Sequence, residues 1–247
     1  MELYFIRHGQ SVSNANWHRS DFIPPPDPEL TEAGHTQAAR LAEFLRERQP
    51  LRDDGFWNVQ NHSGFGLTHL YTSPMQRAVD TACPVAKALD LPLVLWPEIH
   101  EEGGAFIRYP DGKEVCLPGT PRSYYEKHYP NLQLPDQLDE QGWWKSRPVE
   151  TVEERQVRAA QILNELIARH GDQEGRPEQR VAIFSHGGFF VHFMSIVFQI
   201  NYRQGANGAK TWFFMNNTAI TRIDIRKDEF LLCYVNRTEH LSAELIT

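Results

Sequence analysis

Two histidines at the ends of predicted buried strands are the side chains best suited to covalent chemistry in this sequence. His8 lies between Arg7 and a glycine at the end of one apolar run, and His186 directly follows another. An imidazole with one unprotonated ring nitrogen can act as a covalent nucleophile, and neighbouring arginines favour that neutral form by like-charge repulsion. A charged Arg7 at a strand end must reach water or bind an anion. Taken alone, the segment around Arg7 and His8 is compatible with either a solvated arginine or an arginine that binds an anion.

A phosphomonoester is one anion that these residue types can bind and react with. Its transition state spreads negative charge over the phosphoryl oxygens, so positioning and charge stabilisation do most of the catalytic work. Arg7 and Arg77 can each direct two N–H donors at phosphate oxygens. Asn14 and the backbone N–H groups of Gly9 and Gly187 could add donors. These five residues form the predicted phosphate-binding set.

Other familiar chemistries find little support in the sequence. It contains no GxGxxG, GxxxxGK[ST], HExxH or GxSxG motif. None of its 11 histidines pairs with another at i, i+4 on a predicted helix, and Arg7 beside His8 would repel a cation. We therefore expect no metal site and no other cofactor.

Composition restricts the class of protein. The 247 residues are 40% hydrophobic and 23% charged, so the chain can bury a core and is not broadly disordered. A net charge of −7 disfavours a general nucleic-acid binder and a binder of anionic membranes, which are usually basic. Three widely spaced cysteines show no disulfide or zinc pattern. With no signal-peptide pattern and no apolar run long enough to span a bilayer, we expect a cytoplasmic protein.

The elements that must position these side chains alternate between strand and helix. This order predicts one α/β domain over residues 1–247, a three-layer sandwich with a mainly parallel central sheet. Ligands bind at the carboxyl ends of strands in such sheets, so the segments at His8, Ser73 and His186 are expected to meet. The expected strands are 3–6, 69–71, 93–95, 181–184, 211–215, 219–225 and 230–235, and the expected helices are one from Thr31 to Pro50, one capped by Ser73 with Pro74 at its first position, 151–169 and 189–200.

Residues 103–148 differ from the rest of the chain. They are rich in proline and glycine, lack sustained periodicity and contain one predicted helix, near 122–128. Long irregular segments are usually functional, so we interpret this one as a cap-like insertion over the site. Arg108 and Arg122 are its candidates for binding a second part of the substrate, although each is also compatible with a solvated surface charge.

Four segments stand in a fixed order along the chain. They are 6–14 (IRHGQSVSN), 30–38 (LTEAGHTQA), 71–82 (YTSPMQRAVDTA) and 184–188 (FSHGG). Together they resemble the motifs of the histidine phosphatase superfamily, also called the phosphoglycerate mutase-like family, over most of the chain. The resemblance implies that His8 is a nucleophile that becomes phosphohistidine and that His186 stabilises charge across the pocket. It implies that Arg7 and Arg77 clamp the phosphate and that no metal is required.

A carboxylic acid is also expected at the rim of the pocket, because the leaving alcohol needs a proton. Glu98, Glu101 and Glu102 are the candidates, and a solvated acidic run is the alternative to all three. The resemblance favours Glu101, with Ile99 in the hydrophobic place before it and Glu98 as second choice. The aromatic-glycine stretch usual in the family after this acid is replaced here by 102–106 (EGGAF).

We therefore predict a phosphatase, of the histidine-type acid phosphatase kind, that hydrolyses a small phosphomonoester through His8 with Glu101 as proton donor. The first alternative is a phosphoglycerate mutase, whose basic segment is echoed only at 122–124. The second is a non-catalytic binder of a phosphorylated ligand on the same fold. The expected partner is a small phosphorylated metabolite, with no nucleic acid and no membrane, and a homodimer is left open.

Overall fold

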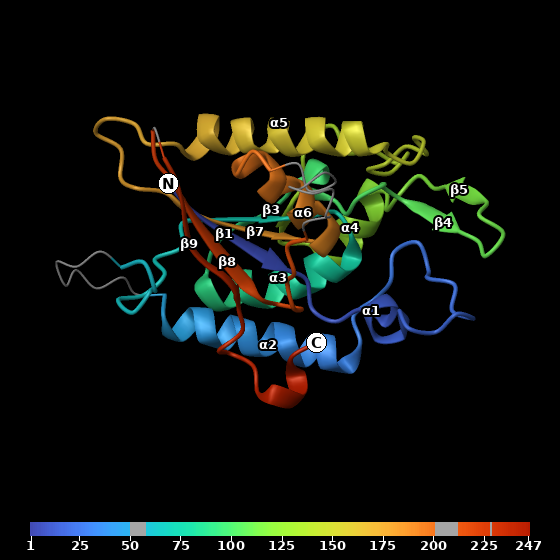
Figure 1. Ribbon diagram of the computed structural model, residues 1–247, viewed down its shortest axis with the longest axis horizontal. Helices are drawn as coiled ribbons and strands as arrows, with labels where there is room; N and C mark the ends of the chain where they lie inside the picture. The colour runs from blue at the N-terminus through green and yellow to red at the C-terminus, as the bar shows by residue number, and fades with distance from the viewer. Residues whose placement is uncertain (50–57, 201–211, 228) are drawn as a thin grey trace.

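A seven-stranded sheet with strand order β6-β3-β2-β7-β1-β8-β9 runs through the middle of the protein (Figure 1). The protein is represented by a computed structural model that describes residues 1–49, 58–200, 212–227 and 229–247. The first five strands in this order pair parallel with one another, and the last two continue the sheet antiparallel. The strands are β1 (Glu2–Arg7), β2 (His69–Thr72), β3 (Leu93–Leu95), β6 (Leu132–Gln133), β7 (Arg180–Ser185), β8 (Ile220–Ile225) and β9 (Phe230–Arg237).

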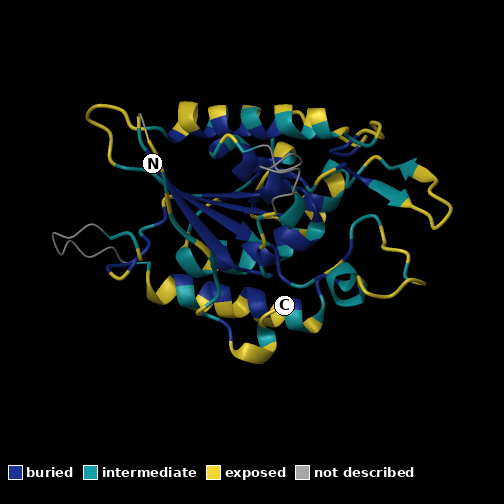
Figure 2. Ribbon diagram, viewed as in Figure 1, coloured by how far each residue is buried: buried dark blue, intermediate teal, exposed yellow. Residues whose placement is uncertain are grey.

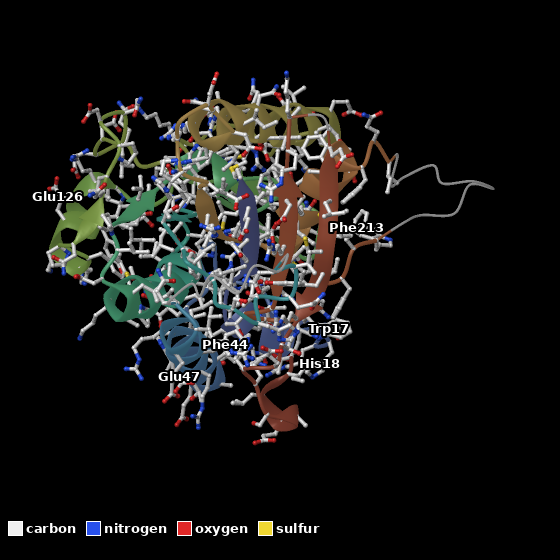
Figure 3. The ribbon with its side chains drawn as sticks, turned by 90° about the vertical axis from the view of Figure 1, so that its left-hand side faces the viewer. Trp17, His18, Phe44, Glu47, Glu126 and Phe213 are labelled. Carbon is white, nitrogen blue, oxygen red and sulfur yellow. The ribbon has the colours of Figure 1, made fainter. Side chains whose placement is uncertain are left out.

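Helices cover both faces of the sheet. α2 (Glu32–Glu47) and α3 (Gln76–Leu89) lie on one face, and α5 (Val152–His170) and α6 (Gly187–Val197) lie on the other. In the turned view of Figure 3 the layers stay separate, with α2, marked by its Phe44, on the opposite side of the sheet from α5. The predicted three-layer α/β sandwich with a mainly parallel sheet is thus confirmed.

Strand β1 shows how the sequence builds the two interfaces. Successive side chains of a strand point to opposite faces of its sheet. Leu3 and Phe5 join the buried cluster beneath α5 and α6, whereas Tyr4 and Ile6 join the cluster beneath α2 and α3. Figure 2 shows the result, a sheet of buried residues between helices that are exposed only on their outer sides. Within the described residues, no helix is both long and apolar enough to cross a membrane.

The helix that carries Arg77 begins later than the sequence indicates. α3 starts at Gln76, so Ser73 is not its cap and Pro74 is not its first residue. The Ser73 hydroxyl instead accepts the Met75 N–H in a turn. Asp27, from a segment far away in sequence, accepts the Gln76 N–H at 3.0 Å and satisfies the start of the helix. The helix was misplaced because its cap comes from another part of the chain.

The expected strand at 211–215 is not formed. Residue 211 lies outside the described part of the chain, as does Pro50, and residues 212–215 are irregular. The Met215 carbonyl accepts a hydrogen bond from the Arg7 guanidinium, and the Asn216 N–H donates to the Asn236 side chain. Side chains therefore satisfy backbone groups here that a strand would have paired.

Segment 103–148 contains more regular structure than expected. β4 (Phe106–Arg108) and β5 (Glu114–Cys116) form a hairpin that projects beyond the end of the sheet, beside the segment after the short helix α1 (Val12–Asn16) (Figure 1). The predicted helix is confirmed as α4 (Arg122–His128), and β6 then joins the edge of the central sheet. Short 3₁₀ helices, η1 (Pro97–Ile99) and η3 (Ala243–Leu245), complete the described elements.

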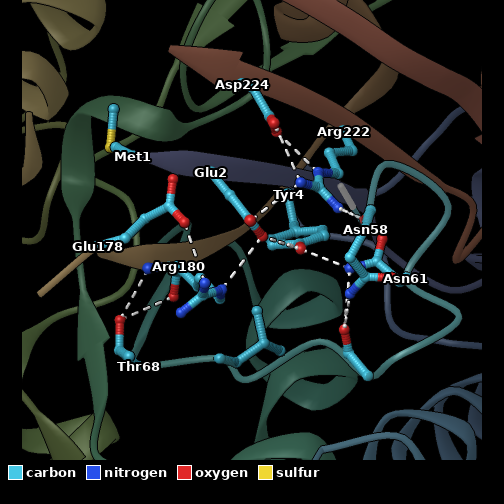
Figure 4. A network of polar contacts seen from close by, with 12 residues as sticks. Met1, Glu2, Tyr4, Asn58, Asn61, Thr68, Glu178, Arg180, Arg222 and Asp224 are labelled. Atoms are coloured by element: carbon cyan, nitrogen blue, oxygen red, sulfur yellow. Dashed lines mark hydrogen bonds and ion pairs between the residues drawn. The ribbon is translucent and has the colours of Figure 1, made fainter. Parts of the chain in front are cut away.

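A closed network of charged and polar side chains surrounds the amino end of β1 (Figure 4). Arg222 of β8, only 1% exposed, donates to both carboxylate oxygens of Asp224, at 2.7 and 3.0 Å. A second carboxylate, Glu2, lies 2.9 Å from the same guanidinium and accepts the Tyr4 hydroxyl at 2.6 Å. The third arm of the guanidinium donates to the Asn58 carbonyl. Every nitrogen of Arg222 thus has a partner.

Candidate active site

A cavity of about 510 Å³ lies at the opposite, carboxyl end of β1 and is lined by Arg108 and by five further predicted site residues. Arg7 and His8 come from the end of β1, and Asn14 comes from α1. Arg77 comes from the first turn of α3, and Glu101 from the segment after η1. Residues from four separate parts of the chain therefore meet where ligands bind in parallel sheets.

Hydrogen bonds define the state of the His8 imidazole. Nδ1 lies 2.7 Å from the Gly9 carbonyl oxygen, which can only accept, so Nδ1 carries the proton. Nε2 lies 3.2 Å from Arg77 Nε, which can only donate, so Nε2 is unprotonated. Burial, followed by the charges of Arg77 and Arg7, holds the pKa of His8 well below its usual value. His8 is therefore a neutral imidazole with its lone pair on Nε2.

Arg7, which is half-buried, and Arg77, which is buried, lack full charge compensation. Arg7 donates to the Met215 carbonyl at 2.5 Å, but among the described residues its buried Nε has no partner and no carboxylate lies within 4 Å of it. Arg77 is 7% exposed, and its nearest carboxylate is Asp27 at 3.5 Å. Burial lowers the pKa of both groups. Two cations with free N–H donors can bind an anion in this geometry.

His186 lies next to His8, the candidate nucleophile. Its ring centroid is 5.1 Å from that of His8, and its Nε2 is 2.7 Å from the Ser73 hydroxyl oxygen. Since that oxygen already accepts the Met75 N–H, its own hydrogen is free to point at Nε2. Burial, and then the charge of Arg77, lowers the pKa of His186 well below its usual value. Both histidines are thus neutral in the free site.

The three acid candidates have different surroundings. Glu101 lines the cavity, and its carboxylate accepts the N–H groups of Gly188 at 3.2 Å and Phe189 at 2.8 Å, at the start of α6. Glu102 lies at the same cavity but is held by Arg155 and by His192, whose hydrogen bond lowers the pKa of this carboxyl. Glu98 lines a different cavity. Geometry therefore favours Glu101.

The two predicted backbone donors, the N–H groups of Gly9 and Gly187, differ in whether they are free to bind a phosphate. The Gly9 N–H donates to the Thr81 hydroxyl at 2.9 Å and is not available to a phosphate, which corrects that expectation. A Cβ on Gly9 would lie 2.7 Å from the Gly34 carbonyl oxygen, so glycine is required by this close approach of two segments. The Gly187 N–H, the first of α6, has no hydrogen-bond partner among the described residues. It remains a candidate donor.

The two basic residues of segment 103–148 do not form a second anion site. Arg122 does not line the cavity, because its guanidinium donates to the carbonyls of Pro135 and Leu138 and ties α4 to the following loop. Its expected role in substrate binding is therefore wrong. Arg108 does line the cavity, but it forms an ion pair with Glu114 across the β4–β5 hairpin at 2.6 Å.

Two supporting residues were absent from the predicted site. Asn217 donates to the His8 carbonyl at 2.9 Å and to the Asn14 side-chain oxygen at 3.1 Å, so it joins the loop that carries His8 to α1. Asp27 is the counter-charge of Arg77, and burial raises the pKa of this carboxyl to about 6. Asp27 lies between two prolines that fix the backbone, and this was the feature of the sequence that could have indicated a positioned carboxylate.

Comparison with known proteins agrees with this geometry. The family model of the histidine phosphatase superfamily (branch 1) matches residues 3–111 and 116–238. A Hydrogenobacter thermophilus protein, provisionally named as a phosphoserine phosphatase, is 26% identical over 246 residues, covering 96% of each chain.

Solved structures share the fold. A phosphoserine phosphatase of Entamoeba histolytica, in complex with phosphoserine, aligns with a TM-score of 0.59 at 19% identity over 98% of this chain and 99% of that one. A mycobacterial glucosyl-3-phosphoglycerate phosphatase aligns with a TM-score of 0.54 at 20% identity, over 95% and 98% of the two chains. The chain belongs to branch 1 of the histidine phosphatase superfamily and is an enzyme of the phosphatase and mutase type.

Proposed function

We propose that the protein is a phosphatase that hydrolyses a small phosphomonoester through a phosphohistidine at His8. The observation that carries the proposal is the unprotonated Nε2 of His8, held beside Arg77 in a cavity that Arg7 and Glu101 also line. A nucleophile, two phosphate-binding cations and a carboxyl group are thus within one site.

In the first step, the His8 Nε2 lone pair forms a bond to phosphorus as the bond from phosphorus to the leaving oxygen breaks. Arg77 transfers its donor from Nε2 to a phosphoryl oxygen, and Arg7 supplies its unpartnered Nε–H. Glu101 enters this step protonated and gives its proton to the leaving alcohol. His186, beside the ring of His8, is in place to stabilise the charge that develops.

In the second step, the Glu101 carboxylate takes a proton from a water molecule whose oxygen attacks phosphorus. The bond from His8 Nε2 to phosphorus breaks, and inorganic phosphate leaves the arginines. Glu101 ends this step protonated and the imidazole ends it neutral, so both are ready for the next cycle. The N–H groups of Gly188 and Phe189 hold the carboxylate in place between the steps.

Two observations support hydrolysis over a mutase reaction. The relatives quoted above carry phosphatase names. The segment that echoes the mutases, 122–124, lies in α4, where Arg122 is occupied by backbone carbonyls outside the cavity. The mutase reaction remains the alternative, because both reactions share the first step.

Replacement of the nucleophile tests the proposal. His8→Ala is expected to lower turnover of a chromogenic phosphomonoester in EDTA by about 10³-fold or more, and to abolish acid-labile phosphoenzyme. His18→Ala, an exposed histidine after α1, is the matched control and should retain both. Transfer to give phosphoglycerate isomers faster than hydrolysis would favour the mutase. Absence of turnover and of phosphoenzyme from the unmodified protein would contradict both enzyme hypotheses.

A second pair of variants tests the proton donor. Glu101→Gln should slow hydrolysis of an alkyl phosphate by about 10²–10⁴-fold, because a poor leaving group needs protonation. The effect should be smaller with 4-nitrophenyl phosphate, whose leaving group is stable as an anion. Glu98→Gln is the control, since Glu98 lines another cavity. A loss confined to Glu98→Gln would reverse the assignment.

A further inference from the structure

We propose that the alcohol part of the substrate is uncharged and apolar, and that it binds between two apolar lips of the catalytic cavity. The inference rests on the proposed phosphatase function and names its substrate class. The phosphate-binding residues occupy only one part of the cavity wall. The rest of the wall determines which alcohol can accompany the phosphate group.

The two lips come from segments that project beyond the carboxyl end of the sheet (Figure 1), and side chains from both segments line the cavity. One is the proline-rich segment between α1 and α2, and the other is the β4–β5 hairpin. The lining side chains that they contribute are mostly apolar or aromatic: Phe22, Ile23, Pro24, Pro25, Pro26 and Pro28 on the first lip, and Phe106, Tyr109 and Pro110 on the second.

Each lip leaves a large side chain in contact with solvent. Ile23 is 46% exposed and Tyr109 is 38% exposed. Exposed apolar side chains of this size beside a functional cavity are a feature of ligand-binding surfaces, because a bound apolar group would remove them from water. The prolines hold one lip in a fixed backbone conformation, so little order has to be gained on binding.

The altered stretch after the catalytic acid places Phe106 on this wall. Gly103 and Gly104 adopt φ values of +87° and +89°, which side chains other than glycine rarely tolerate. A Cβ on Gly103 would lie 2.6 Å from the Phe106 ring, and one on Gly104 would overlap Trp144. The two glycines therefore let the chain turn tightly and bring an aromatic ring to the rim.

The charges of the cavity argue against an ionic alcohol. Apart from the phosphate-binding pair, the remaining arginine among the described lining residues is Arg108, which is already paired with Glu114. A carboxylate on the alcohol would find no unpaired cation there and would face the Glu102 carboxylate, while Glu101 takes part in the first step in its protonated, uncharged form. An ammonium group would have to compete with Arg155 for Glu102. An uncharged alcohol avoids both costs.

A series of alkyl phosphates tests the inference. Ethyl, butyl and hexyl phosphate have similar leaving groups, so differences in kcat/KM report binding of the chain. If about half of each added methylene is buried, kcat/KM should rise on the order of tenfold from ethyl to hexyl phosphate. O-phospho-L-serine should be hydrolysed no faster than ethyl phosphate, because its charged groups lack partners.

Variants of the lips locate the effect. Ile23→Ser and Tyr109→Ser should each lower the ratio of kcat/KM for hexyl over ethyl phosphate by about twofold to fivefold. Val157→Ser is the matched control, because Val157 is 57% exposed on α5 and does not line the cavity. Its ratio should equal that of the unmodified protein, and thermal melts should confirm that all three variants fold.

The outcomes separate the two proposals. Hydrolysis of the whole panel with no dependence on chain length, or with phosphoserine preferred, would overturn the apolar subsite and leave the phosphatase intact. A chain-length effect that both lip variants preserve would also overturn it. Hydrolysis of none of the panel would contradict the phosphatase itself, and this inference with it.

Discussion

The arginines near the two ends of strand β1 are in opposite electrostatic conditions. At the amino end, Arg222 contacts the carboxylates of Asp224 and Glu2 and a backbone carbonyl. At the carboxyl end, Arg7 has no carboxylate within 4 Å among the described residues, and Arg77 has one at 3.5 Å. The ends lie on one six-residue strand.

The pKa directions follow this difference. Burial alone would lower the pKa of all three guanidinium groups, because it disfavours the charged form. Hydrogen bonds and charges from Asp224 and Glu2 overcome burial at Arg222 and raise its pKa, whereas burial dominates at Arg7 and Arg77 and lowers theirs. Buried charge is therefore a sign of a ligand site only where its partners are incomplete.

The largest effect on stability is expected at the amino end of β1, where Arg222 is fully paired. Asp224→Ala would leave Arg222 buried with one carboxylate and should lower the free energy of unfolding by about 3–5 kcal/mol. Chemical denaturation measures this value. The kcat/KM of the folded fraction should stay close to that of the unmodified protein, because Asp224 lies at the far end of β1. A small loss of stability with a large loss of activity would contradict the comparison.

At the carboxyl end of β1, we expect a large loss of activity with only a small loss of stability. Arg7→Met should lower kcat/KM for a phosphomonoester by about 10²–10³-fold, since a donor to the transition state is lost. The free energy of unfolding should change by no more than about 2 kcal/mol, because the loss of the charged hydrogen bond to the Met215 carbonyl is partly offset by removal of an incompletely paired charge. Inorganic phosphate should raise the melting temperature of the unmodified protein and not that of the variant. Equal destabilisation by Arg7→Met and Asp224→Ala would show that the two ends do not differ.

A smaller effect, dependent on pH, is expected from Asp27, the partial counter-charge of Arg77. Its pKa of about 6 in the folded protein lies above the ordinary value of 3.8, so the folded state binds this proton more tightly. The corresponding stability is present below pH 3.8 and is lost as the pH rises through about 6. The Asp27→Asn variant cannot lose stability in this way. As the pH rises from 3.8 to about 6, its free energy of unfolding should therefore increase relative to that of the unmodified protein. Denaturation at pH 4 and pH 7 measures the change, and parallel pH profiles would contradict it.

Sequence reasoning succeeded where the signal was local. The Thr31 cap and the buried Leu41 of α2 follow from spacing along one helix, and Arg7 and His8 follow directly from the end of an apolar strand. The end of a second apolar strand indicated His186 in the same way, and the resemblance added the roles of His186 and Arg77, which the fold brings to the same place.

It failed where a partner came from elsewhere in the chain. α3 begins two residues late because Asp27 caps it from 49 residues away. The Gly9 N–H was assigned to phosphate because nothing in the sequence shows that Thr81 accepts it. Arg122 was interpreted by its charge, whereas the carbonyls that bind it are set by the packing of α4. Strand β6 has only two residues, too few for a periodic pattern.

The parallel ladder between β1 and β7 has a consequence for how this enzyme can vary. Arg7 pairs with Ser185, and the His8 N–H donates to the Ser185 carbonyl at 3.0 Å, so the ladder itself fixes the spacing between the two histidines. If the pairing register of β1 against β7 shifted by one residue, the side chains of the shifted strand would point to the other face of the sheet. The two lips of the cavity take no part in this pairing. Insertions or substitutions there can accumulate over evolution and change which alcohol fits, while the distance between the histidines stays constant.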